Sequence, residues 1–155
     1  MKAEELMGTW SLESCHAKGS SGGEMLPLGE APRGYLTYTP WGYMTAVLMS
    51  TGRAKFASGY LWGGTPDEIK EAFQGFDAYG GPYEFDEKSG KITHHAEVAR
   101  LPNWEGTAQV RYAKLVAGTL TLTTPPVLAQ GEEWVASLTW SRTDGHPASP
   151  RTTTS

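Results

Sequence analysis

Four side chains of this sequence have the chemistry for acid–base or electrostatic catalysis: the adjacent His94 and His95, Arg111 and Tyr83. A neutral imidazole inside an aromatic pocket can donate to a ligand carbonyl or move a proton near neutral pH. A fixed guanidinium in a low-dielectric site can hold a carboxylate or polarise an enolate oxygen, and a tyrosine hydroxyl can stabilise the same charge. These residues therefore indicate chemistry at a carbonyl or carboxylate group.

Each of these assignments has an alternative. The two adjacent histidines cannot bind one metal ion together, because neighbours in a strand point to opposite faces. His94 fits equally well as a structural histidine that is hydrogen-bonded to Tyr83. Arg111 fits equally well as a surface residue that is paired with Glu97 or Glu84.

The elements that must position these residues are β-strands. Between residues 7 and 142, short segments alternate apolar and polar side chains and are separated by turns that contain Gly or Pro. Alternation at period two is typical of half-buried strands, and strands in this number must close into a barrel or a sandwich. A small barrel would enclose a pocket lined by aromatic side chains and a few polar groups.

The clearest hairpin covers residues 34–49, with Pro40 and Trp41 in a type I turn and Gly42 in the left-handed position. Its more apolar face is expected inside the barrel: Leu36, Tyr38, Met44, Ala46 and Leu48. The opposite face, Tyr35, Thr37, Thr45 and Val47, is expected outside. In the first strand, residues 7–16, alternation places on one face Trp10, Leu12, Ser14 and His16, and Trp10 and Leu12 should point inward.

A second hairpin, with a four-residue loop at 87–90, pairs Tyr83 with His94 and Phe85 with Ile92 and turns all four inward. The last strand, residues 133–142, turns to one face Trp134, Ala136, Leu138 and Trp140, and it closes the barrel beside the first strand.

Two registers are open for the strands at 107–115 and 119–124. A two-residue turn at Ala117 and Gly118 places Arg111 inside, and a three-residue loop places Tyr112 there instead. We favour the first register.

One amphipathic helix is predicted over residues 65–79. Thr65 is its N-cap and forms a capping box with Glu68, and a glycine pair at 80–81 ends it. Its apolar stripe consists of Ile69, Ala72, Phe73 and Phe76, and is expected to pack against an end or a wall of the barrel. The Gly/Pro-rich loop at 17–33 is a candidate lid.

Composition limits the function further. A net charge of −4 with scattered basic residues disfavours nucleic acid and membrane partners. A single cysteine, Cys15, and a charged N-terminus without a signal sequence or a membrane span favour a cytoplasmic protein with a packed thiol. Residues 1–142 are expected to form one domain and residues 143–155 a disordered tail. The apolar outer residues Tyr35 and Val47 make a homodimer possible.

Several sequence blocks, in this order, resemble the lipocalin-like domain family: GTW, PLGEAPRGYLTYTPWGYMTAVLM, FASGYLWGGTPDEIKEAF, ITHHAEV, LPNWEGTAQVRY and LTLTTPP. The resemblance covers about residues 6–142. It implies an all-β, up-and-down antiparallel barrel with an internal cavity for a mainly apolar ligand. Similar barrels act as cyclases in natural-product pathways. Trp41 departs from the small polar turn residue that is more usual in the family.

We therefore expect a cofactor-free cyclase or isomerase of the pericyclase type, which folds an apolar substrate inside the barrel. Its catalytic residues would be His94, Arg111 and Tyr83. The ligand-binding residues would be Trp10, Tyr38, Met44, Leu48, Phe85, Trp104, Leu122 and Trp134. No metal and no cofactor is expected, since the signatures of hydrolases, kinases and dehydrogenases are missing. The alternatives are a non-enzymatic carrier or sensor of a hydrophobic metabolite, and an interaction module that uses Trp41 and Trp62.

Overall fold

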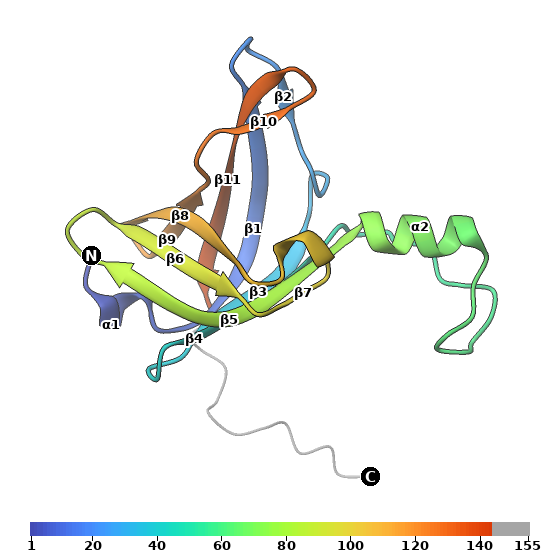
Figure 1. Cartoon of the computed structure of the whole chain (residues 1–155), viewed down its shortest axis with the longest axis horizontal. Coiled ribbons are helices and arrows are strands. Elements are labelled where there is room, and N and C mark those ends of the chain that lie inside the picture. Colours follow the sequence, from blue (N-terminus) through green and yellow to red (C-terminus); the bar gives the residue numbers. More distant parts are fainter. Residues whose placement is uncertain (144–155) are drawn as a thin grey trace.

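The computed structural model describes residues 1–143, so the predicted tail at 143–155 lies outside the described residues apart from Thr143 (Figure 1). The strands are β1 (Gly8–Gly19), β2 (Glu24–Met25), β3 (Arg33–Tyr38), β4 (Tyr43–Met49), β5 (Phe76–Asp86), β6 (Lys91–Ala96), β7 (Val98–Ala99), β8 (Thr107–Val116), β9 (Thr119–Thr123), β10 (Val127–Ala129) and β11 (Glu132–Arg142). The helices are α1 (Ala3–Leu6), α2 (Pro66–Gln74) and the 3-10 turn η1 (Pro102–Trp104).

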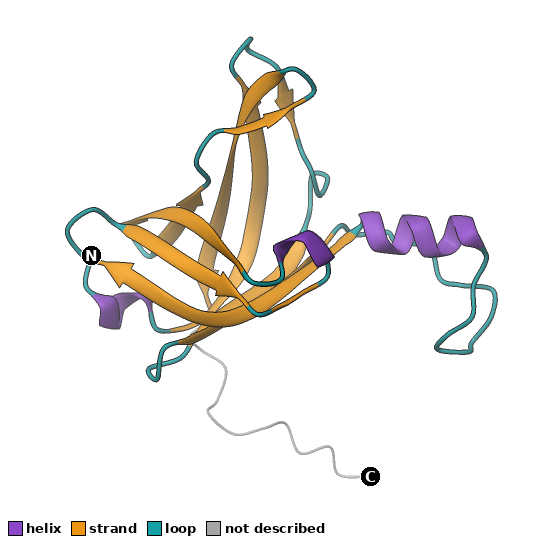
Figure 2. Cartoon of the chain, viewed as in Figure 1, coloured by secondary structure: helices purple, strands orange, loops and turns teal. Residues whose placement is uncertain are grey.

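Eight of these strands form a closed antiparallel barrel. Their order around the barrel is β1-β3-β4-β5-β6-β8-β9-β11, and β11 pairs with β1, beside which it lies in Figure 1, to close it. Figure 2 shows the strands of the barrel in orange and the helices outside it in purple. The short strands β2, β7 and β10 extend the sheet beside β1, β5 and β11. The predicted all-β, up-and-down barrel is confirmed.

The hairpin registers agree with the sequence analysis. Tyr38 lies opposite Met44 in the first hairpin, and Tyr83 lies opposite His94 in the second. Ala117 and Gly118 both have positive φ and form the two-residue turn between β8 and β9. This register turns Arg111 to the barrel interior and leaves Tyr112 about half exposed on the outside.

The first strand contains a β-bulge that the sequence analysis missed. The pairing of β1 with β11 shifts between Leu12 and Ser14, so the alternation changes phase at Glu13. Trp10 and Leu12 point inward as predicted, but beyond the bulge Cys15 and Ala17 are buried and His16 is exposed. The inward placement of Ser14 and His16 was therefore wrong.

The end of the barrel next to α1 is filled by packed side chains. Trp10 is fully buried there, and its indole nitrogen donates to the carbonyl of Leu6 at 2.8 Å. Arg142 lies over the Trp10 ring at 4.3 Å and donates to the carbonyl of Met7 at 2.8 Å. The buried core that continues from this end comprises Leu6, Trp10, Leu12, Leu36, Tyr38, Met44, Ala46, Leu48, Tyr79, Ile92, Ala96, Leu120, Leu122 and Trp140.

Helix α2 is shorter than predicted and projects from the barrel (Figure 1). Its N-terminus has the expected capping box, in which Thr65 accepts from the Glu68 backbone N–H. It ends at Gln74, because residues 76–79 pair with β4 as the start of β5. None of its residues is buried, and Ile69 and Phe73 are about half exposed. The expectation that its apolar stripe packs against the barrel was wrong.

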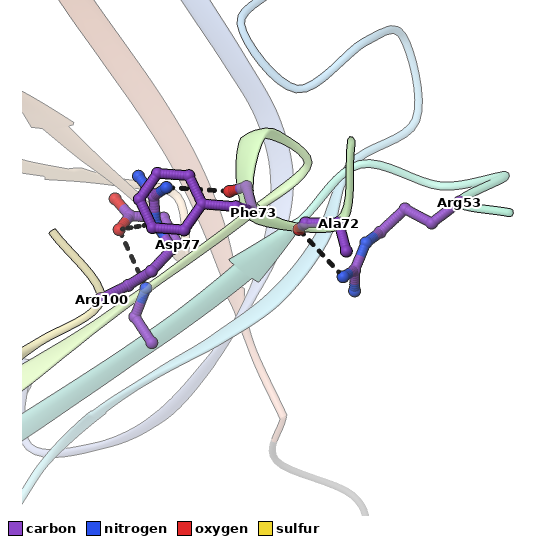
Figure 3. A network of polar contacts seen from close by, with 6 residues as sticks. Arg53, Ala72, Phe73, Asp77 and Arg100 are labelled. Atoms are coloured by element: carbon purple, nitrogen blue, oxygen red, sulfur yellow. Dashed lines mark hydrogen bonds and ion pairs between the residues drawn. The ribbon is translucent and has the colours of Figure 1, made fainter. Parts of the chain in front are cut away.

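Two arginines hold the last turn of α2: Arg100, which follows strand β7 of the barrel, and Arg53, in the loop that precedes the helix (Figure 3). Arg53 donates to the carbonyl of Ala72 at 3.1 Å. Arg100 donates to the carbonyl of Phe73 at 2.8 Å, lies over the Phe73 ring at 4.0 Å and pairs with Asp77 at 3.3 Å. Cations near a helix C-terminus satisfy its free carbonyls and interact favourably with the helix dipole.

The close contact of β5 with the chain at β6 predicts a strict requirement for glycine at position 81. A Cβ atom there would lie 1.9 Å from the carbonyl oxygen of His95. We expect Gly81→Ala to lower the free energy of unfolding by about 3 kcal/mol, as for an overpacked core, in urea titrations. Gly59→Ala is the control and should be neutral, since no atom lies within 4 Å of the position that its added Cβ would take. Equal stability of the two variants would contradict this packing.

Candidate functional site

The barrel is hollow at the end away from α1. The cavity there has a volume of about 520 Å³, within the range of small-molecule sites. Most of its wall is apolar, with Leu36, Ala46, Leu48, Leu122, Leu138 and Trp140. Its polar side chains include Tyr79, Arg100, Gln109 and Arg111. The interior is thus divided into a packed half and a hollow half.

The residues proposed from sequence are distributed over both halves. Four of them line the cavity: Leu48, Trp104, Arg111 and Leu122. Tyr38, Met44, Phe85 and Trp10 belong to the packed core or lie against it. Trp134 is partly buried outside the cavity wall, with its ring next to Gly23. Tyr83 donates its hydroxyl hydrogen to the carbonyl of Thr39 at 3.0 Å and does not line the cavity.

His94 lies between two tyrosine hydroxyl groups. It is completely buried, and its Nε2 lies 2.8 Å from the hydroxyl of Tyr38 while its Nδ1 lies 2.8 Å from the hydroxyl of Tyr79. Burial, together with the positive charge of Arg111, lowers the pKa of His94 to about 3. The histidine is therefore neutral at physiological pH. The partner suggested from sequence, Tyr83, was wrong.

Hydrogen-bond accounting assigns the proton positions in this network. The hydroxyl of Tyr38 is fully buried, and His94 is its one hydrogen-bond partner within residues 1–143. Its hydrogen is satisfied only if it donates to Nε2 of His94. The ring proton of neutral His94 is then on Nδ1, from which it is donated to the oxygen of Tyr79. We assign this tautomer from the network.

Tyr79 is the residue that connects this network to the cavity. It lines the cavity wall together with Arg111, whose positive charge acts on its hydroxyl group. Because the Tyr79 oxygen accepts from His94, its own hydrogen is left to donate to a molecule in the cavity. Burial raises the pKa of Tyr79, which keeps this hydroxyl protonated at neutral pH.

Arg111 places a positive charge on the cavity wall. Its guanidinium donates to the carbonyl of Val110 at 2.7 Å and lies 6.0 Å from the centre of the Trp104 ring. Within residues 1–143 it forms no ion pair with a carboxylate. Of the two glutamates considered from sequence, Glu84 lies 3.3 Å from His95 instead. Arg111 and Tyr79 together place two donors on the wall of a mainly apolar cavity, which is also lined by Asp77, Arg100 and Gln109.

The sequence analysis did not identify Tyr79, because it placed this residue in the predicted helix. Gly80 and Gly81 were interpreted as the stop signal of that helix, whereas they lie within strand β5. Tyr79, Gly81, Tyr83 and Phe85 occupy alternate positions, and this alternation indicates a strand that begins before Gly80.

Other kinds of site find little support in the described part of the chain. Within residues 1–143, no group of three His, Cys, Asp or Glu side chains is arranged to hold a metal ion. Burial raises the pKa of Cys15 to about 11, which keeps this thiol protonated and unreactive at neutral pH. The same residues include no helix with the length and hydrophobicity to cross a membrane.

The low pKa of His94 predicts acid destabilisation of the fold. Between pH 6.5 and pH 3 the unfolded chain binds a proton at this residue and the folded chain does not, so stability falls as the pH falls. The expected slope from His94 is up to about 1.4 kcal/mol per pH unit, measured by urea unfolding between pH 7.5 and 4.5. His94→Gln should lose this part of the slope, and His95→Gln, at an exposed site, should keep it. An unchanged slope in His94→Gln would contradict the assignment.

Comparison with known proteins gives one match. The family model described as a lipocalin-like domain matches residues 7–143. No curated protein and no solved structure shows significant similarity to the chain. The match covers every strand of the barrel and agrees with a hollow, mainly apolar interior suited to a small hydrophobic ligand. The chain therefore belongs to the family of lipocalin-like domains.

Proposed function

We propose that the barrel binds a mainly apolar molecule that carries a carbonyl or carboxylate oxygen, and that it catalyses a cofactor-free cyclisation or isomerisation of that molecule. One observation carries this proposal: the donors Arg111 and Tyr79 on the wall of a mainly apolar cavity. The apolar wall accommodates the hydrocarbon part of the ligand, and the two donors fix the position of its oxygen.

The chemistry of such a step needs little from the protein. In a cyclisation or isomerisation the bonds that form and break all belong to the substrate, so no electrons are exchanged with the protein. The cavity would hold a flexible chain in a reactive conformation, which can contribute several kcal/mol to the rate. Negative charge that develops on the substrate oxygen would be stabilised by Arg111 and Tyr79, in a site whose wall is mainly apolar.

His94 acts in this proposal as a positioning residue. Its side chain is fully buried and does not line the cavity, but it fixes Tyr79 through the hydrogen bond at 2.8 Å. Tyr38, on the other side of the ring, fixes the tautomer in turn. Tyr38 and His94 together thus leave the hydroxyl hydrogen of Tyr79 to be donated toward the cavity.

The proposed anchor predicts a binding preference for an anionic head group. We expect dodecanoate to displace a fluorescent naphthalene sulfonate from the barrel more effectively than dodecanol does. Arg111→Met should weaken dodecanoate binding by about 10- to 100-fold, the range for a hydrogen bond to a charged group, and change dodecanol binding little. Lys114→Met, three residues along the same strand and exposed, is the matched control. Equal losses for both ligands would contradict a charge anchor.

The catalytic part of the proposal predicts a pair of metabolites of identical mass. Deletion of the gene in the source organism should cause an open-chain compound to accumulate, and the purified protein should convert that compound into its isomer. Tyr79→Phe and Arg111→Met should each slow this conversion at least tenfold. A protein that copurifies with an unchanged metabolite and converts nothing would instead be the carrier considered above, and the catalytic proposal would be wrong.

A further inference from the structure

Residues 50–75, which we call the arm, extend from the barrel between β4 and β5 (Figure 1). The arm exposes large apolar side chains to an unusual degree: Tyr60 66%, Leu61 83%, Trp62 80%, Ile69 50% and Phe73 45%. Ile69 and Phe73 are four residues apart and share one face of α2, where they form an apolar stripe. Several large apolar side chains exposed on one segment are typical of an interaction site.

A second apolar surface lies on the outside of the barrel, over β4, β5 and β7. It is a groove of about 730 Å³. Its floor is low because Ala78 and Gly80 have little or no side chain, and its sides are formed by residues that include Tyr43, Val47 and Val98. These three side chains are 51%, 41% and 74% exposed. A small-residue floor between larger apolar side chains is the shape that receives the apolar stripe of a helix.

The arm does not cover the groove of its own chain. The pairing of Met49 with Phe76 fixes both ends of the arm at the end of the barrel. Arg100 of the barrel then holds the carbonyl of Phe73, and within the arm Arg53 holds the carbonyl of Ala72 (Figure 3). Helix α2 projects away from the barrel (Figure 1). Folding the helix back onto β5 would break these contacts.

We propose that the arm of one molecule packs into the groove of a second copy of this chain, and that the exchange is reciprocal about a two-fold axis. The dimensions agree: nine residues of α2 are about 13 Å long, and the β5 residues 76–81 that border the groove span roughly 17–20 Å. A symmetric exchange covers both apolar surfaces of both chains, and neither is left to continue into a filament.

Charge complementarity supports a second copy as the occupant. Lys70 is next to the stripe of α2, and Glu97 borders the groove next to Val98. Both are exposed, and neither forms an ion pair within residues 1–143. When the stripe packs into the groove of the second copy, one of the two directions of the helix brings these opposite charges to the same border. This contact would also orient the helix in the groove.

The first experiment measures the mass in solution by analytical ultracentrifugation of the full chain. We expect a species of twice the chain mass of 16.8 kDa. Val98→Asp and Ile69→Asp should each raise the dimer dissociation constant at least tenfold while the circular dichroism spectrum stays unchanged. Val116→Asp is the matched control, because Val116 is also exposed, at 57%, but lies on β8. A monomeric wild type, or a dimer equally weakened by Val116→Asp, would overturn the proposal.

A second experiment distinguishes exchange between chains from closure within one chain. Ile69→Cys protein and Val98→Cys protein are mixed and oxidised; the native Cys15 is buried. We expect a disulfide between the two different variants, and little cross-linking in either variant alone. A monomer linked internally in the double cysteine variant, with no mixed dimer, would show that the arm closes on its own barrel and would refute the exchange.

A third experiment exchanges the two charges. Lys70→Glu and Glu97→Lys should each weaken the dimer, and the double variant should restore it.

Discussion

The pairing of β1 with β11 is the interaction on which the rest of the structure depends. It joins the first and the last long strand of the chain. The paired residues run from Trp10 opposite Arg142 to Gly19 opposite Trp134. Closure removes both long edges of the sheet, and alternate side chains of every strand then face one interior. Tyr38 and His94, from strands that are not neighbours in the sheet, meet only because the sheet is closed. The bulge at Glu13 adjusts the first strand to this closure and turns Cys15 inward.

A buried polar network marks the border between the packed and the hollow half of the barrel. A fully buried imidazole is costly unless both of its nitrogens are hydrogen-bonded, and the hydroxyls of Tyr38 and Tyr79 satisfy them. The aromatic packing around Trp10 excludes water on one side, and the cavity lies on the other. The network is therefore structural at Tyr38 and faces the cavity at Tyr79. In the proposed function, Tyr79 is therefore the member of the network that contacts the substrate.

Local patterns account for the parts of the fold that sequence analysis predicted. The hairpins at 34–49 and 83–98 have short connections, so their turn residues and alternation determine the pairing, including the inward direction of His94. The bulge at Glu13 depends on pairing with β11, a strand that is more than 100 residues away in the sequence, and it has no local signal. Tyr79 was missed because the apolar spacing of the helix continues to Phe76, which overlaps the first residue of the strand. Which cavity residues contact a ligand depends on where the packed half ends, and alternation alone does not show this.

The direction of α2 illustrates a more general limit. An amphipathic stripe shows that a helix needs an apolar partner, but it does not show whether the partner belongs to the same molecule. Here Arg100 holds the C-terminal end of the helix, since it pairs with Asp77 and donates to the carbonyl of Phe73. Arg100 also lines the cavity. The same guanidinium therefore sets the direction of the arm and forms part of the polar rim of the cavity. The projecting helix and the interior of the barrel are thus in contact through one side chain, Arg100.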